Sequence, residues 1–396
     1  DVARMVLRGP TGARALRPPD FYAPGGALSS FRDFGGALLY AGATPSALAA
    51  LAALPDLTGR VVVLGPPFEG ADAVEAELAR RGAEGILSIV PDDGFYHRLR
   101  VARGPTRFAL PEPVGDVRNQ GPLPSVVGGA EVLEALGLAG ELRPGHAPER
   151  ARSLDLEMSV RFGFSRAPAL GYSVAGMVAG TDPTLAAQAV LYVAHYDHVS
   201  GGEPAGGDSI WNGFLDNAAG AAMLLEIARA LARDPPARSV LFLFTTAEEQ
   251  GLLGASWFLH RPPWPLERIR AALNLDGGAP PGDPEGWSLA GAAASEAGAV
   301  AAAALERLGY AVEERPIRAD SDHWAFHQAG VAALFLHPGG RLRGLSEEES
   351  AARYARWFVA HTPHDEWSAD FPFEGMAAYA RAALAIGRAL ADAPLR

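Results

Sequence analysis

The segment Ala-Val-Leu-Tyr-Val-Ala-His-Tyr-Asp at residues 189–197 decides the fold class. Its first six residues are apolar or aromatic without interruption, which is typical of a strand covered on both faces. Three similar runs follow, and helical stretches with one apolar stripe lie among them. The runs are 239–245, 271–275 and 331–336, and the helical stretches are 217–232, 293–308 and 374–390. This alternation predicts an α/β domain with helices on both faces of its sheet.

A different pattern occupies the chain before this domain. Short β-type runs at 37–40, 60–64, 85–90 and 124–127 accompany helix-like stretches at 47–54 and 73–81. Residues 143–152 are typical of a linker. We predict a β-rich domain over residues 1–150 and a catalytic domain over residues 151–396, which opens with a strand at 154–162.

Composition excludes several classes of function. The formal net charge of −12 and the pI of about 5.3 argue against nucleic acid and anionic membranes as partners, because both need a concentrated basic surface. Lysine and cysteine are absent, which excludes Schiff-base lysines, phosphate loops and thiolate metal sites. The apolar stretch 292–305 contains Glu296, so no membrane span is expected. Because the chain begins at Asp1, we interpret it as processed or trimmed and expect an extracytoplasmic location, periplasmic or secreted.

Titratable residues follow three of the predicted strands. His195 and Asp197 come after the first, Glu248 and Glu249 after the second, and Asp276 after the third. The carboxyl ends of strands in an open α/β sheet form the ligand-binding crevice, so we expect these side chains to converge. Carboxylates buried together need a counter-ion, and no arginine lies near these strand ends in the sequence. A metal ion is therefore the better candidate.

Two further residues complete the candidate set. Asp216 directly precedes the helix at 217–232, where it could act as a cap, but the polar loop 207–213 would deliver it to the crevice. His361 begins the segment His-Thr-Pro-His-Asp before the last helix. Two imidazoles and three carboxylates suit zinc and accept cobalt or manganese. Two ions about 3.5 to 4 Å apart that share a carboxylate form a centre used for hydrolysis.

The remaining carboxylates have other uses. Glu248 and Glu249 are adjacent, so their side chains diverge and only one can readily bind a given metal, while the other is free to move a proton. Asp197 lies two residues after His195 on an extended segment. It therefore points the same way and can accept a hydrogen bond from the imidazole nitrogen that does not bind metal.

Five motifs in one order resemble the co-catalytic zinc aminopeptidases of metallopeptidase clan MH, a group that includes bacterial leucyl aminopeptidases and glutamate carboxypeptidases. The motifs are His195-x-Asp197, Asp216-Asn217-Ala218-Ala219-Gly220, Ala247-Glu248-Glu249, Asn274-Leu275-Asp276 and His361-Thr362-Pro363-His364-Asp365. The resemblance covers residues 155–392 and implies the zinc exopeptidase fold, with a mixed, mostly parallel twisted sheet. It also implies a cis peptide bond between Asp216 and Asn217.

The same resemblance assigns roles at the site. It implies two zinc ions, with His195 and Asp276 on one, Glu249 and His361 on the other, and Asp216 on both. Glu248 is then the general base that activates a metal-bridging water. The implied reaction is hydrolysis of the N-terminal bond of peptides with a free N-terminus.

Other parts of the chain match the family less closely. Residues 1–150 resemble a protease-associated (PA) domain through the segments 56–63, 82–87 and 124–127. Relatives often have a tyrosine before the last ligand histidine to steady the tetrahedral intermediate, where this chain has Ala360. His323 or a more distant tyrosine could replace it. His198, His327 and His337 match no ligand position, and we interpret all three as structural.

Three rival functions follow from the same fold. A glutaminyl-cyclase-like enzyme would use a single zinc, and the five-ligand set argues against it. A carboxypeptidase acting on acidic dipeptides needs several arginines around the substrate, whereas only Arg318 lies near a motif. A non-enzymatic binding protein of this fold would have lost ligands, and none is lost here.

Overall fold

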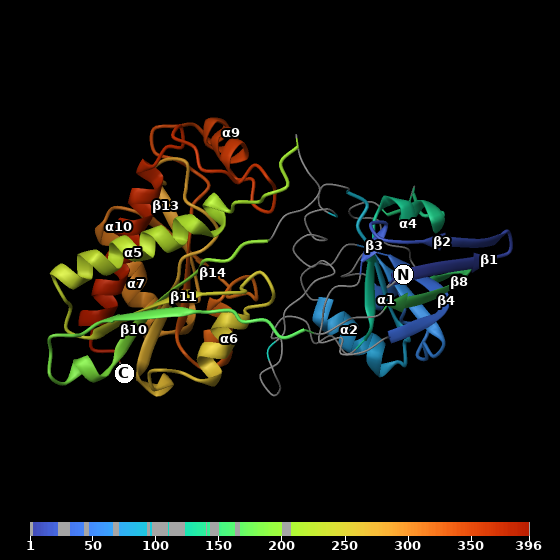
Figure 1. The fold of residues 1–396 in the computed structure, drawn as a ribbon, viewed down its shortest axis with the longest axis horizontal. Coiled ribbons are helices and arrows are strands. Elements are labelled where there is room, and N and C mark those ends of the chain that lie inside the picture. The colour runs from blue at the N-terminus through green and yellow to red at the C-terminus, as the bar shows by residue number, and fades with distance from the viewer. Residues whose placement is uncertain are drawn as a thin grey trace. The chain divides into compact units, whose positions relative to one another are not determined.

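The computed structural model describes residues 3–22, 32–42, 47–65, 71–92, 96, 110, 123–139, 141–142, 150–162, 167–199 and 207–395. The described residues divide into two compact units (Figure 1). One unit takes its described residues from 1–107 and 119–169, and the other takes them from 108–118 and 170–396. Most of the predicted linker, residues 143–149, lies outside the described residues.

The first unit is built on an eight-stranded sheet with the order β2-β1-β8-β4-β5-β6-β7-β3. Strands β4, β5, β6 and β7 run parallel to one another, and apolar side chains are buried on both faces. Its short helices are α1 (Ala47–Ala50), α2 (Ala71–Arg80) and α4 (Ala130–Ala135). Its strands are β1 (Ala3–Gly9), β2 (Gly12–Leu16), β3 (Phe21–Tyr22), β4 (Arg32–Gly42), β5 (Arg60–Leu64), β6 (Gly85–Ile89), β7 (Ser125–Gly128) and β8 (Arg152–Phe162).

Strand β8 corrects the predicted domain boundary. The sequence pattern placed this strand at the start of the catalytic domain, but β8 pairs antiparallel with both β1 and β4. It therefore belongs to the first sheet, and the first unit extends to Ala169 instead of ending near residue 150.

The second unit contains a seven-stranded sheet with the order β14-β13-β15-β12-β10-β11-β9. Four of its strand pairs are parallel and two are antiparallel, which confirms the predicted mixed, mostly parallel sheet. Its strands are β9 (Val174–Val178), β10 (Ala189–His195), β11 (Ser239–Thr245), β12 (Ile269–Asn274), β13 (Gly286–Ala290), β14 (Ala311–Arg315) and β15 (Ala333–Pro338).

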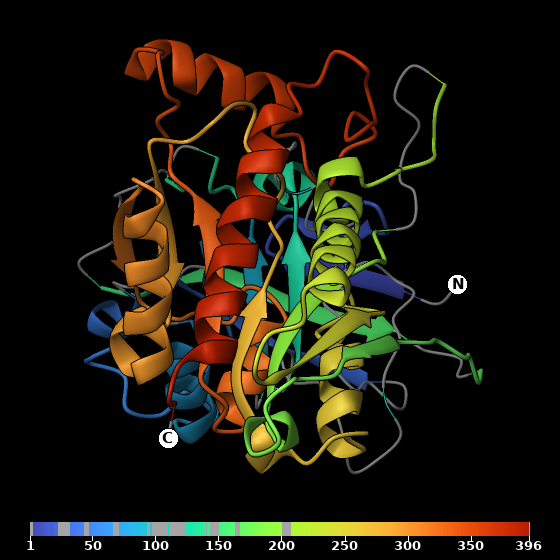
Figure 2. The same cartoon turned by 90° about the vertical axis from the view of Figure 1, so that its left-hand side faces the viewer.

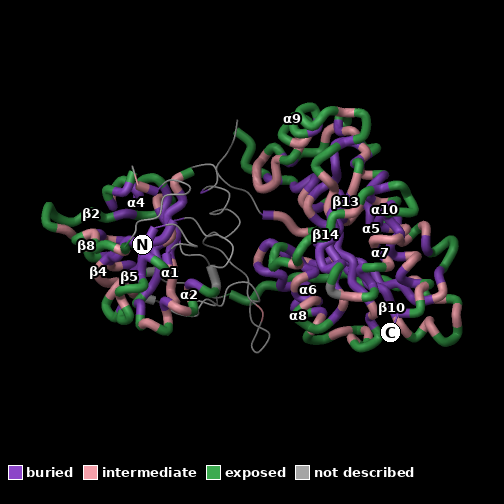
Figure 3. Tube along the Cα trace, turned by 180° about the vertical axis from the view of Figure 1, so that it is seen from behind, coloured by how far each residue is buried: buried purple, intermediate pink, exposed green. Residues whose placement is uncertain are grey.

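Helices cover both faces of the second sheet, as predicted. Helices α5 (Ala219–Arg233), α7 (Glu296–Arg307) and α10 (Glu374–Asp392) lie side by side over one face and share a core with the strands (Figure 2). Helices α6 (Leu253–His260) and α8 (His323–Gln328) pack on the other face. The central strands are buried, whereas α9 (Glu347–Trp357) is largely exposed (Figure 3). Among the described residues, no helix is both long enough and apolar enough to cross a membrane.

The register of the central strands sets the position of the site. Strand β10 lies between β11 and β12 and runs parallel to both. His195 is opposite Thr245, and Val193 is opposite Asn274. The residues that follow the three strands therefore emerge at one edge of the sheet.

Candidate metal centre

The structure brings together the predicted ligands from five separate segments. His195 ends β10, Glu249 follows β11, and Asp276 follows β12. Asp216 lies in a kinked turn at 214–218 before α5, and His361 lies in the loop between α9 and α10. Their side chains form two groups whose potential ligand atoms lie within 4.8 Å of one another, and Asp216 belongs to both groups.

The first group is deeply buried. The Nε2 atom of His195 lies 3.2 Å from Oδ1 of Asp216 and 3.2 Å from Oδ1 of Asp276. The His195 side chain is only 1% exposed. The Nε2 atom of the imidazole therefore faces two carboxylates, and the Nδ1 atom points away from both.

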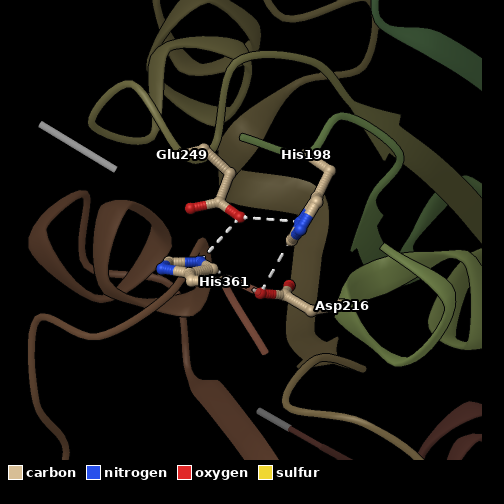
Figure 4. A group of neighbouring side chains, drawn as sticks. All are labelled: His198, Asp216, Glu249 and His361. Carbon is tan, nitrogen blue, oxygen red and sulfur yellow. Dashed lines mark hydrogen bonds and ion pairs between the residues drawn. The ribbon is translucent and has the colours of Figure 1, made fainter. Parts of the chain in front are cut away.

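The second group lies on the opposite oxygen of Asp216 (Figure 4). The Nε2 atom of His361 is 3.1 Å from Oδ2 of Asp216 and 2.9 Å from Oε1 of Glu249. His198, which we had interpreted as structural, also belongs to this group. Each carboxylate oxygen of Asp216 thus faces a different imidazole.

Asp197 and Glu248 lie beside these groups and belong to neither. The Nδ1 atom of His195 is 3.0 Å from the backbone oxygen of Asp197 and 3.7 Å from its Oδ1 atom. The Asp197 carboxylate accepts hydrogen bonds from the backbone N–H groups of Glu248 and Glu249, at 3.1 and 3.3 Å. It therefore joins the turn after β10 to the turn after β11. Glu248 itself is 4% exposed.

Buried polar groups hold Asp216 in place. Its backbone N–H and that of Leu215 donate to the carboxylate of Asp365, at 3.0 and 2.7 Å. The side chain of Asn217, and not that of Asp216, accepts a hydrogen bond from the N–H of Gly220 in the first turn of α5. The peptide bond between Asp216 and Asn217 is cis, which confirms the expectation from the family resemblance.

Asp276 is held by a second set of buried groups. Its carboxylate accepts a hydrogen bond from Ser321, whose hydroxyl in turn accepts one from the side chain of Asn274 at 2.7 Å. Asn274 is at the end of β12, and Ser321 directly precedes the turn into α8. These bonds fix the orientation of a potential ligand without using the oxygen that faces His195.

The electrostatics of the site favour charged carboxylates and protonated imidazoles. Burial alone would lower the pKa of His361, but hydrogen bonds to Asp216 and Glu249 outweigh it and raise this pKa from 6.5 to about 10. Burial likewise opposes the charge on His195, yet the neighbouring carboxylates raise its pKa well above 6.5. Burial would raise the pKa of Asp216 and Asp276, but the same imidazoles lower both. Nearby positive charge thus stabilises these carboxylates, and a metal ion can supply that charge in place of the protonated imidazoles.

Of the other histidines near the motifs, His323 is buried, and His327 and His337 are half-buried. His323, one alternative for stabilising the oxyanion, is 1% exposed, and its ring centroid is 4.5 Å from that of Phe335. His327 packs against Trp324 and His337 against Phe335, in agreement with structural roles.

Three residues of the site were missed by sequence reasoning. His198 and Asp365 lie within the quoted motif segments or beside them, so their positions were the available signal. Ser321 lies two residues before His323 and outside the five motifs. Their partners could not be inferred, because each contact joins residues 18 to 150 positions apart; these contacts are His198 with Asp216, Ser321 with Asp276 and Leu215 with Asp365.

Curated relatives match less than half of the chain. A probable leucine aminopeptidase 2 of Aspergillus oryzae is 30% identical over 197 residues, which are 46% of this chain and 36% of that protein. An aminopeptidase of Pseudomonas aeruginosa is 32% identical over 182 residues, 42% of this chain and 31% of that protein. The matched region thus spans about a third of the length of these relatives.

A solved structure shares the fold. BSAP, a zinc aminopeptidase from Bacillus subtilis, aligns over 98% of this chain and 81% of its own, with a TM-score of 0.55 and 19% sequence identity. Peptidase family M28 matches residues 173–386, which include every residue of both ligand groups. Because this match covers more than half of the chain, the protein belongs to peptidase family M28.

Proposed function

We propose that the protein is a zinc-dependent aminopeptidase that hydrolyses the N-terminal bond of peptides at a centre of two metal ions. The observation that carries this proposal is the pair of ligand groups that share Asp216. Family membership and the aminopeptidase relatives support the reaction class. The zinc aminopeptidase with the same fold is in agreement with zinc as the metal.

The side chains present fit such a centre chemically. Imidazole nitrogens and carboxylate oxygens are the donors that catalytic zinc sites use. The two groups divide so that His195 and Asp276 would hold one ion, Glu249 and His361 the other, and Asp216 both. The acidic side chains around the site would also attract the free amine of a peptide.

Zinc bound by these residues would act as a Lewis acid that lowers the pKa of water and polarises the scissile carbonyl oxygen. The protein's own residues then perform the proton transfers. We propose that the Glu248 carboxylate takes the proton of the attacking water and delivers it to the leaving amine. Asp197 positions Glu248, because its carboxylate holds the backbone of Glu248 and Glu249 beside His195.

The geometry favours this function over its rivals. A glutaminyl-cyclase-like enzyme with a single zinc would need only one ligand group, whereas here two groups meet at one carboxylate. A non-enzymatic binding protein would have no use for a complete set of buried ligands with their supporting hydrogen bonds. An acidic site attracts the amine of a peptide and repels the extra carboxylates of an acidic dipeptide, so the aminopeptidase is favoured over the carboxypeptidase.

A panel of aminoacyl p-nitroanilides, each with its N-acetylated counterpart, tests the proposed function. We expect cleavage only of substrates with a free amine, loss of activity after chelation, and recovery when zinc is added back. Equal cleavage of the acetylated substrates would contradict an aminopeptidase. Release of a C-terminal acidic residue, or cyclisation of an N-terminal glutamine, would instead identify one of the rival functions.

Replacing Ser321 with alanine is expected to weaken zinc binding about 10- to 100-fold at the His195 site, because Asp276 loses the hydrogen bond that orients it. Binding at the His361 site should change little. Competition with a chromophoric chelator measures both affinities. The matched control is Ser288→Ala, which changes another buried serine of the second unit, on β13. Equal effects of the two substitutions would show that Ser321 has no specific part in metal binding.

Two further sequence-based interpretations remain predictions. One is that the first unit is a protease-associated domain, and the other is that the protein works outside the cytoplasm. Fractionation of the producing cells, followed by detection of the protein in each fraction, tests the second.

A further inference from the structure

The His198 side chain is the feature of the site that the family resemblance leaves without a role. His198 directly follows Asp197 in the turn after β10. Its side chain is only 8% exposed, and neither ring nitrogen has a hydrogen-bond partner. A buried imidazole that makes no hydrogen bond is unfavourable, and a cation placed between this ring and the neighbouring carboxylates would interact with both.

The ring points into the second ligand group (Figure 4). Its Nδ1 atom lies 3.2 Å from Oε1 of Glu249 and 3.8 Å from Oδ2 of Asp216. Its ring centroid is 5.6 Å from that of His361, with the two planes tilted by 60°. Carboxylates from two other segments therefore lie near Nδ1 of His198, and the ring of His361 lies beside the His198 ring.

Packing against Gly213 holds the ring in this orientation. Gly213 has a φ of +67°, which favours glycine, and an added Cβ there would come within 2.5 Å of Cγ of His198. Gly213 begins the turn that carries Asp216. The turn that delivers the shared carboxylate thus also leaves the space that the His198 ring fills.

We propose that His198 is a fourth protein ligand of the metal ion held by Asp216, Glu249 and His361, an inference that rests on the proposed function. The two sites then differ. The His361 site has two imidazoles and two carboxylates, whereas the His195 site has one imidazole and two carboxylates. Four protein ligands are typical of closed zinc sites, and three leave a position for water or substrate. The ion at the His361 site should therefore bind more tightly, and the His195 site should keep the open position.

A cysteine at position 198 tests the proposal directly, because the natural chain contains no cysteine. Thiolate binds zinc and cobalt. With Co²⁺ in place of zinc, we expect His198→Cys to give a sulfur-to-cobalt charge-transfer band in the near ultraviolet. The control is His364→Cys, an exposed position in the segment that carries His361, which should give no band. No band from a folded, cobalt-loaded His198→Cys protein would overturn the proposal.

Metal affinity gives a second test that does not depend on activity. We expect His198→Ala to weaken one of two zinc equivalents by about 100-fold or more, since even loss of a group behind a ligand costs 10- to 100-fold. The other equivalent should bind as in the natural protein, and His364→Ala should change neither. Unchanged binding of both equivalents in His198→Ala would overturn the ligand role and leave the proposed function standing. Failure of the natural protein to bind zinc would overturn both.

Discussion

Replacing Glu248 with glutamine is expected to leave two metal ions bound and to lower kcat by roughly 10²- to 10⁴-fold, the contribution of a general base. Glutamine keeps the shape of the side chain but has no basic carboxylate. Glu248 belongs to neither ligand group, and its backbone N–H donates to Asp197, so the substitution should preserve the fold of the turn. Steady-state kinetics on an aminoacyl p-nitroanilide, with metal analysis of the same sample, measures both effects.

The control for this prediction is Glu226→Gln on the exposed surface of α5, which makes the same chemical change away from the site. Near-normal kcat in Glu248→Gln would show that another group moves the proton. Loss of one metal ion would show instead that Glu248 is a ligand, in conflict with the division of roles between Glu248 and Glu249.

A second large effect is expected for Asp216→Asn. Asp216 offers one oxygen to His195 at 3.2 Å and the other to His361 at 3.1 Å. An amide has no negative charge and presents an NH₂ group to one of the two sites. We therefore expect bound zinc to fall from two ions per chain to one or none. A loss of several kcal/mol in transition-state stabilisation lowers kcat/KM by about 10³-fold or more.

The matched control is Asp370→Asn, which removes a carboxylate from an exposed position of the second unit. We expect Asp216→Asn to keep the fold, because Asp365 binds the backbone N–H groups of residues 215 and 216 and not the substituted side chain. Circular dichroism of both variants checks this. An Asp216→Asn protein that is folded, holds two zinc ions and keeps its activity would contradict the shared-ligand arrangement.

The strongest sequence patterns gave the central strands accurately. The predicted runs at 60–64 and 239–245 coincide with β5 and β11. Apart from a polar residue at one or both ends, each is an uninterrupted apolar run, which has few alternatives to a buried strand. By contrast, β9 and β14 are largely exposed. A glycine lies in the middle of the apolar run of β9, and β14 contains three charged residues, so both strands depend on pairing with their neighbours more than on their own sequences. The strand predicted at 154–162 exists as β8, but the sheet to which it belongs was predicted wrongly, because its pairing with β1 and β4 is not written in its own sequence.

At the site, the order of the motifs predicted which residues would converge, because parallel strands bring their carboxyl ends to one edge. All five predicted ligands lie in the two groups. The supporting contacts were beyond the reach of the sequence. Whether His198 points into the site depends on the space left by Gly213, and whether Ser321 reaches Asp276 depends on how α8 packs on β12.

Anomalous diffraction at the zinc edge, from crystals of the zinc-loaded protein, tests the central claim most directly. The predicted result is two peaks about 3.5 to 4 Å apart with Asp216 between them, one beside His195 and Asp276 and the other beside Glu249 and His361. A single peak that does not touch Asp216, or no peak at these residues in an active sample, would contradict the account.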